Sequence, residues 1–314
     1  MSNVQITSDE QELNYTRSVA SSSRLHLPKI SILRNYLYVI PLFVLVGGLI
    51  LYAVAYTFEI SFYDWNGFSA NRTWVGIDNY KEIVQDPVVH QVLVNSVIYA
   101  LATIFIQMFL GLFLAILLTL KVRFKTLYKV IFFLPVVTAP AVVSYVFRQI
   151  YSANGQLNQL LEMLGLGGLT QVWLADPGFA LGSVIAINIW QWTGFSFIMY
   201  MAALTVIDPD LYEAATIDGA SFFQIMRDIT FPMLRSTHFT LMILGAIGAL
   251  KTFDLVWLTT QGGPGRATEL MSTYIFKKGV LEFSAGYSAA LSIVLLLFAL
   301  TLTIIQTMFY QRNK

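Results

Sequence analysis

Residues 211–232 read LYEAATIDGASFFQIMRDITFP, a polar segment between two apolar segments that are each long enough to cross a bilayer. Asp208 and Pro209, just before it, predict a helix start, because an acid caps the first free N–H groups and proline is tolerated at the first helical position. Gly219 predicts a left-handed turn that ends this helix. Ala214 and Ala215 are small enough to let another backbone approach closely, so we expect a docking element here.

The residues after Gly219 predict a second helix with one apolar face. Its apolar side chains recur at helical spacing, at Phe222, Phe223, Met226 and Ile229. Pro232 marks the end of this helix or a bend before the next apolar segment.

The same stretch contains a spaced pattern of residues. Three residues separate Glu213-Ala214-Ala215 from Gly219, nine further residues separate Gly219 from Ile229, and one residue separates Ile229 from Phe231-Pro232. This pattern resembles the EAA loop of permease subunits of binding-protein-dependent ABC importers, whose usual ending has Leu in place of Phe231. In that family the loop sits in a cleft of the ATPase subunit and passes ATP-driven motion to the membrane helices.

The resemblance implies a cytoplasmic coupling loop over residues 205–237. It assigns an ATPase-coupling role to Glu213, Ala214, Ala215, Asp218, Gly219, Ile229 and Pro232. An ordinary amphipathic connector on the membrane surface is the alternative interpretation.

The composition is that of an integral membrane protein. Of the 314 residues, 56% are hydrophobic and only 12% are charged, against about 25% charged residues in soluble domains. The sequence has no cysteine, and its three histidines are scattered, so no metal site is expected. The net charge of +1 gives no indication of a nucleic-acid partner.

Six stretches are long and apolar enough to cross a membrane, which needs roughly 20 residues each. They are residues 36–58, 95–120, 129–147, 179–204, 239–259 and 287–308. Pro135 and Pro140 predict a kink in the third stretch, with freed carbonyls that need partners elsewhere. We therefore expect an all-α, polytopic membrane helix bundle of six transmembrane helices over residues 35–314, preceded by a flexible cytoplasmic tail over residues 1–34.

The lysines and arginines predict the orientation. Twelve of the nineteen lie with the two termini, the 120–129 loop and the loop of Glu213, while six lie on the opposite side and Lys251 lies inside the fifth stretch. Because basic loops stay in the cytoplasm, both termini and the Glu213 loop are expected there. The predicted location is the bacterial plasma (inner) membrane, crossed several times.

Polar and aromatic side chains in the fourth stretch form a candidate substrate path. Four lie on one helix face, Asn188, Gln191, Trp192 and Phe195, and Trp190 lies nearby. Amides and aromatic rings suit a sugar, but paired amides also join neighbouring membrane helices. The sequence leaves both interpretations open.

Lys251 and Asp254 in the fifth stretch lie three residues apart, which predicts either a structural intrahelical pair or direct solute contact. Their surroundings form a second pattern, Lys251-Thr252-Phe253-Asp254 followed by Thr260-Gln261-Gly262-Gly263-Pro264 and Thr268. It resembles the first of the two permease subunits in carbohydrate importers of the glycerol-3-phosphate, multiple-sugar and lactose/arabinose types.

This second resemblance implies the type I ABC importer permease fold. It also implies four kinds of partner: a second related permease subunit, two ATPase subunits that bind ATP and Mg, an extracytoplasmic solute-binding protein and membrane lipid. The implied substrate is a carbohydrate, and Phe253 joins the candidate path.

The chain is not expected to be an enzyme or to bind a cofactor of its own. It contains no G-x-x-x-x-G-K-[ST] loop, so another chain must hydrolyse ATP, and no catalytic residue is predicted. An ion-coupled secondary transporter that uses Lys251 and Asp254 is the alternative function. A membrane enzyme would need clustered His, Asp or Glu, which the spans do not offer.

Overall fold

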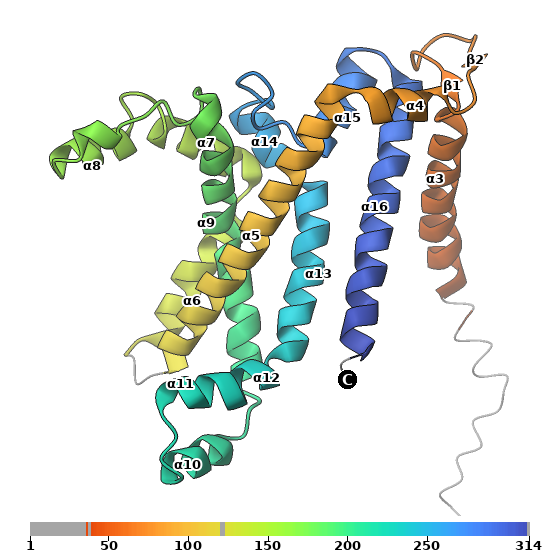
Figure 1. Cartoon of the computed structure of the whole chain (residues 1–314). Coiled ribbons are helices and arrows are strands. Elements are labelled where there is room, and N and C mark those ends of the chain that lie inside the picture. Colours follow the sequence, from red (N-terminus) through yellow and green to blue (C-terminus); the bar gives the residue numbers. More distant parts are fainter. Residues whose placement is uncertain (1–35, 37–38, 120–122, 313–314) are drawn as a thin grey trace, which may run out of the picture. The chain divides into compact units, whose positions relative to one another are not determined.

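The computed structural model describes Tyr36, residues 39–119 and residues 123–312 (Figure 1). The predicted tail at residues 1–34 and Lys121 lie outside the described residues. The chain divides into two units, one up to Tyr56 and one from Thr57 onward. In the first unit the described chain is helical, with the π-helix η1 (Phe43–Gly47) and the start of α3 (Gly48–Ile60). Its side chains are almost all exposed, as expected of a helix that faces lipid.

The second unit is helical apart from one two-stranded ribbon among its described residues. Its first elements are β1 (Tyr63–Asp64), β2 (Thr73–Trp74), α4 (Asp78–Gln85), α5 (Pro87–Thr119), α6 (Lys125–Phe133), η2 (Leu134–Val137), α7 (Pro140–Ile150), α8 (Gln156–Met163), η3 (Gly167–Leu169) and α9 (Pro177–Leu204). The later ones are α10 (Pro209–Ile217), α11 (Phe222–Ile225), η4 (Met226–Thr230), α12 (Phe231–Met233), α13 (Arg235–Lys251), α14 (Asp254–Thr259), α15 (Met271–Phe276), η5 (Lys277–Leu281) and α16 (Ala285–Arg312). Strands β1 and β2 pair antiparallel.

Within the described ranges, three straight helices are long and apolar enough to cross a membrane: Val39–Ile60, Pro87–Thr119 and Ala285–Arg312. Three bent pairs also qualify, so the number of spans rises to six if each pair is one span. These pairs are Lys125–Val137 with Pro140–Ile150 (96°), Pro177–Leu204 with Pro209–Ile217 (74°), and Phe222–Met233 with Arg235–Lys251 (63°). Each of the six predicted stretches overlaps one of these helices or pairs, and the fifth, residues 239–259, extends beyond its pair into α14.

The kink predicted in the third stretch is confirmed. Pro135 lies in η2 and Pro140 opens α7, and the two helical pieces meet at 96°. The side-chain amide of Gln191 on α9 donates a hydrogen bond of 3.1 Å to the carbonyl of Thr138, inside the break. A neighbouring helix therefore supplies the partner that a freed carbonyl in a membrane requires.

The prediction of one continuous fifth helix was wrong. Helix α13 ends at Lys251, and α14 begins at Asp254 after a break at Thr252 and Phe253. Thr252 is extended, and its hydroxyl donates to the carbonyl of Gly248 at 2.9 Å. The hydroxyl of Ser272 donates to the carbonyl of Thr252. Because that partner comes from α15, twenty residues further along, the apolar run alone could not reveal the break.

Helix α9 approaches two neighbouring helices closely at glycines, α5 at Gly111 and α6 at Gly194. A side chain at Gly111 on α5 would meet the Cβ of Ser196 at 2.6 Å and the backbone N of Phe197 at 2.8 Å. A side chain at Gly194 on α9 would lie 1.9 Å from the backbone oxygen of Phe132 on α6. Buried apolar side chains of these helices and α13, including Phe197 and Leu241, form the core beside the crossings.

A second apolar cluster joins α4, α5, α15 and α16 at the end of the unit opposite the 205–237 loop (Figure 1). It surrounds the carboxylate of Asp86, which accepts hydrogen bonds from the hydroxyls of Tyr274 at 2.8 Å and Tyr287 at 3.1 Å. Partial burial raises the pKa of Asp86, but these bonds, one from the backbone of Val88 and the charge of Lys278 outweigh it and lower the pKa below 3.8. The ionised carboxylate therefore stabilises this junction.

Acidification should weaken the junction at Asp86. A carboxyl whose pKa is lower in the folded state stabilises the fold above its ordinary pKa and loses this contribution as the pH falls through the folded value. We expect the melting temperature in detergent to fall as the pH drops below about 4, and Asp86→Asn to flatten part of that fall. Glu82→Gln, an exposed acid on α4, is the matched control; an equal flattening there would contradict the assignment.

Candidate coupling loop and solute path

Helix α10 is built as the sequence predicts. Asp208 caps it, with its side chain accepting a hydrogen bond of 3.0 Å from the backbone N–H of Asp210, and Pro209 is its first residue. Asp218 follows the last turn, and Gly219 adopts φ +77°, the left-handed turn that ends the helix. Because both ends are satisfied locally, α10 can form as a compact element at the edge of the unit.

The side chains of the predicted coupling residues differ in exposure. Glu213 and Ala214 are exposed, while Ala215 is half-buried. Ile217 at the end of α10 is 85% exposed. The outer face of α10 thus combines a carboxylate, a small residue and an uncovered apolar side chain.

A contact that the sequence did not suggest ties the two halves of the loop together. The hydroxyl of Tyr212 on α10 lies 3.3 Å from the hydroxyl of Thr230 on η4, and Thr230 is buried. Tyr212 also packs against the core formed by α5, α9 and α13. The position of α10 is therefore coupled to the helices that follow and precede it.

The second half of the loop agrees only partly with its predicted apolar face. It forms α11, η4 and α12, and it starts with a capping box in which Ser221 and Gln224 bond each other's backbone N–H groups. Met226 and Ile229 are half-buried, whereas Phe222 is 58% and Phe223 is 82% exposed. The π-turn at η4 shifts the register, so the first two aromatic rings turn outward.

The predicted bend near Pro232 is confirmed. The helical segment Phe222–Met233 meets α13 at 63°. Pro232 lies in the last turn before this bend, in α12, where its missing N–H and its ring disfavour a continuous helix.

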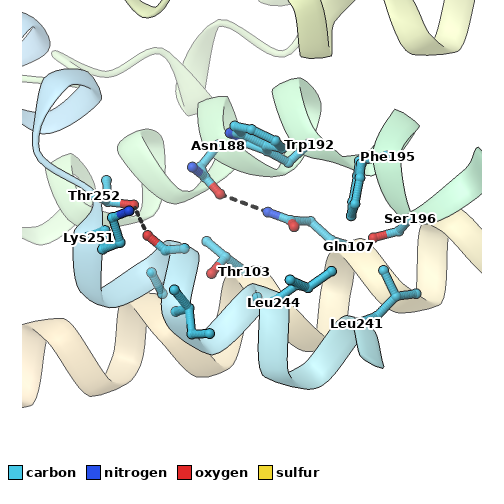
Figure 2. Close-up of a pocket in the computed structure, with 14 residues that line it drawn as sticks. Thr103, Gln107, Asn188, Trp192, Phe195, Ser196, Leu241, Leu244, Lys251 and Thr252 are labelled. Carbon is cyan, nitrogen blue, oxygen red and sulfur yellow. Dashed lines mark hydrogen bonds between the residues drawn. The ribbon is translucent and has the colours of Figure 1, made fainter. Parts of the chain in front are cut away.

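A cavity of about 350 Å³ lies between α5, α9 and α13 (Figure 2). Its polar walls come from Thr103, Gln107, Asn188, Ser196, Lys251 and Thr252, and its aromatic walls come from Trp192 and Phe195. The amide of Gln107 donates to the side-chain oxygen of Asn188 at 2.7 Å. Gln107 and Thr103 on α5 were missed because they lie in an otherwise apolar run and face the cavity only through the α5–α9 crossing.

The four residues that were predicted to share one face of α9 have two different roles in the structure. Asn188, Trp192 and Phe195 line the cavity, whereas the buried Gln191 turns toward the break in the third stretch and bonds the Thr138 carbonyl. Trp190 packs edge-on against Phe147 on α7, with ring centroids 5.1 Å apart. The helical period places the four residues on one face of α9, but Gln191 is bound to the Thr138 carbonyl in the neighbouring break of the third stretch.

The expected pair of Lys251 and Asp254 is not formed. Lys251 is the last residue of α13 and lines the cavity, while Asp254 is the first residue of α14 after the break. Among the described residues, no ion pair joins these two side chains. Phe253, in the break, stacks on Trp257 at 5.7 Å and lies 5.0 Å from Phe276. The two charges therefore lie on different helices, and both side chains are exposed.

A buried acid that the sequence did not reveal lies beside the Gly-Gly-Pro turn. Glu269 is fully buried, and its carboxylate lies 2.7 Å from the ammonium of Lys277. Gly262 has φ +82°, and a side chain there would lie 3.2 Å from that carboxylate. The hydroxyl of Thr268 donates to the carbonyl of Gly263 at 2.7 Å. The motif residues thus shape the turn that follows α14.

Substitutions on α9 should separate cavity residues from structural ones. We expect Trp192→Ala to change the KM for the transported solute by roughly tenfold, as for the loss of one aromatic contact. Gln191→Leu should leave KM unchanged and lower the melting temperature, because the Thr138 carbonyl loses its donor. An altered KM for Gln191→Leu together with an unaltered one for Trp192→Ala would contradict this assignment.

A helical membrane unit with a polar cavity between its helices and an exposed helical loop at one end defines an integral membrane transport subunit. Residues 92–314 match the family described as "Binding-protein-dependent transport system inner membrane component". The chain belongs to this family, and it is a subunit of the inner membrane. The predicted resemblance and the predicted location are thereby confirmed.

Individual relatives agree with this assignment. The chain is 36% identical over 284 residues to "Probable ABC transporter permease protein YurN" of Bacillus subtilis (strain 168), covering 88% of this chain and 97% of that protein. It is 32% identical over 296 residues to "Lactose transport system permease protein LacF" of Rhizobium radiobacter, covering 92% and 97%. A solved bacterial alginate ABC transporter, in complex with alginate pentasaccharide-bound periplasmic protein, matches with a TM-score of 0.77 at 23% identity, covering 90% and 96%.

Proposed function

We propose that this chain forms half of the translocation path for a sugar or oligosaccharide in an ABC importer. The observation that carries the proposal is the cavity between α5, α9 and α13. Its amides and hydroxyls can exchange hydrogen bonds with sugar hydroxyls, and Trp192 and Phe195 offer faces for the apolar side of a sugar ring. The match to a lactose transport permease supports the carbohydrate class.

The motor is a separate pair of ATPase subunits in this proposal. The coupling contact is the outer face of α10, with Glu213, Ala214 and Gly219, and its movement reaches the core through Tyr212 and Thr230. ATP and Mg bind to the ATPase subunits, because this sequence has no phosphate-binding loop.

The remaining partners follow from the same assembly. A second, related permease chain completes the path, and an extracytoplasmic binding protein delivers the solute to the end of the unit that holds α4 and α15. The alginate transporter, which was solved with a periplasmic protein bound, supports an arrangement of this kind.

Reconstitution tests this function. The chain is purified with its co-expressed permease and ATPase partners, placed in liposomes, and supplied with the binding protein and candidate sugars. We expect ATP hydrolysis that rises when the sugar-loaded binding protein is added, and sugar uptake that requires ATP. Uptake that follows an ion gradient without ATP would overturn the proposal in favour of the ion-coupled alternative.

A further inference from the structure

We propose that the groove between α5, α13 and α16 binds one anionic phospholipid, with its headgroup at the end of α13 that adjoins the coupling loop. Two cavities form this groove, one of about 510 Å³ and one of about 310 Å³, and they share Met242 and Gln306 in their walls. The first is apolar, and the second is lined in part by Arg235, His238 and Tyr310.

The larger cavity has the length of an acyl chain. Along α16 it extends from Val294 to Gln306, which is about 18 Å at 1.5 Å per residue. One leaflet of the hydrocarbon core is about 15 Å thick, whereas a transmembrane helix needs about 30 Å. The cavity therefore fits one leaflet's chain and is too short for a spanning helix of another subunit.

Packed side chains border the end of the larger cavity that lies away from the coupling loop. Leu93, Val294 and Leu295 line this cavity and also pack against the apolar cluster that contains Tyr287 and Leu291. An acyl chain that enters from the coupling-loop end therefore meets packed side chains at Val294 and Leu295 on α16.

The smaller cavity provides the chemistry of a headgroup site. Arg235 brings a positive charge to it, and basic positions at a membrane surface attract anionic lipid. Phe239 and Tyr310 stack at 4.3 Å in its wall, as aromatic residues do at the level of the headgroups. The side-chain oxygen of Gln306 is buried and finds no hydrogen-bond partner within the described part of the chain, so it can accept from a headgroup hydroxyl.

Together these features select phosphatidylglycerol, whose phosphate is anionic and whose headgroup carries hydroxyls, as the probe. The chain is placed in nanodiscs of phosphatidylcholine with one-tenth phosphatidylglycerol, and the phospholipid retained after detergent release is counted by native mass spectrometry. We expect one phosphatidylglycerol per chain, enriched over its share of the bilayer. Retention in proportion to the bilayer composition would overturn the proposal.

Two matched pairs of variants locate the site. Arg235→Gln should lower phosphatidylglycerol retention about fivefold, and Arg312→Gln, an exposed arginine at the same end of α16, should not. Leu302→Trp fills the larger cavity and should abolish retention, whereas Ile304→Trp, exposed on the same helix, should not. If the two variants of each pair change phosphatidylglycerol retention equally, the proposed site is wrong. If Leu302→Trp does not fold, the comparison of Arg235→Gln with Arg312→Gln decides alone.

A cross-linking measurement identifies the occupant of the groove. Because the chain has no cysteine, Leu302→Cys gives a single thiol that can carry a photoreactive probe in the assembled complex. Cross-links to phosphatidylglycerol would support the proposal. Cross-links to another polypeptide would overturn it, because they would show that a protein helix covers the groove.

Discussion

Glu213→Lys should abolish solute uptake while the chain still inserts and assembles its helices. Glu213 is exposed on α10, so its replacement should change the free energy of unfolding little, by about 0.5 kcal/mol. Breaking a charged contact with a partner costs about 2–5 kcal/mol. We expect uptake to fall on the order of 100-fold or more. The measurement is sugar uptake in vesicles, together with the amount of chain in the membrane.

The control for this variant is Glu82→Lys, an exposed acid on α4 at the opposite end of the unit. It should leave the coupling of ATP hydrolysis to transport intact. Normal uptake and a normal yield of ATPase-bound complex in Glu213→Lys would show that α10 is an ordinary connector.

Gly194→Val should prevent the chain from reaching its folded state. Even the first carbon of a side chain at this position would lie 1.9 Å from the backbone oxygen of Phe132, and backbone cannot move aside as a flexible side chain can. Overpacking costs about 1–3 kcal/mol, and more where backbone is displaced. The same displacement would separate Gln191 from the Thr138 carbonyl, which leaves a polar group unpaired in the membrane.

The matched control is Gly182→Val on the same helix, where an added side chain meets nothing within 4 Å. Both variants are compared by the yield of monodisperse protein in detergent and by its melting temperature. We expect a large loss for Gly194→Val and a small one for Gly182→Val. Equal behaviour of the two would show that α9 does not press against α6 as described.

Much of the fold follows from local signals in the sequence. The apolar runs, the proline positions and the Asp208-Pro209 start each act within a few residues, so the helices, the kink near Pro135 and the ends of α10 could be predicted. The family pattern around Glu213 is also local. For this reason the class of the protein was predictable before any tertiary contact was known.

The features that escaped prediction depend on contacts between distant segments. The break after Lys251 is stabilised by Ser272, and Gln191 leaves the cavity face because the broken third stretch lies beside it. In the sequence, Glu269 cannot be told from an ordinary loop acid, because its burial beside Lys277 appears only in the structure. Helical periodicity reports which residues share a face, but it does not report which neighbour occupies that face.

The most direct test of the central claim is the side of the membrane on which α10 lies, because a cytoplasmic ATPase can reach it only from within. The chain has no cysteine, so Thr216→Cys on α10 and Ser69→Cys in the β1–β2 connection, both exposed positions, can be labelled singly. With a membrane-impermeant maleimide on spheroplasts, we predict that Ser69→Cys reacts at once and that Thr216→Cys reacts only after permeabilisation. Labelling of Thr216→Cys in sealed spheroplasts would contradict the account, because the loop would then face away from any cytoplasmic motor.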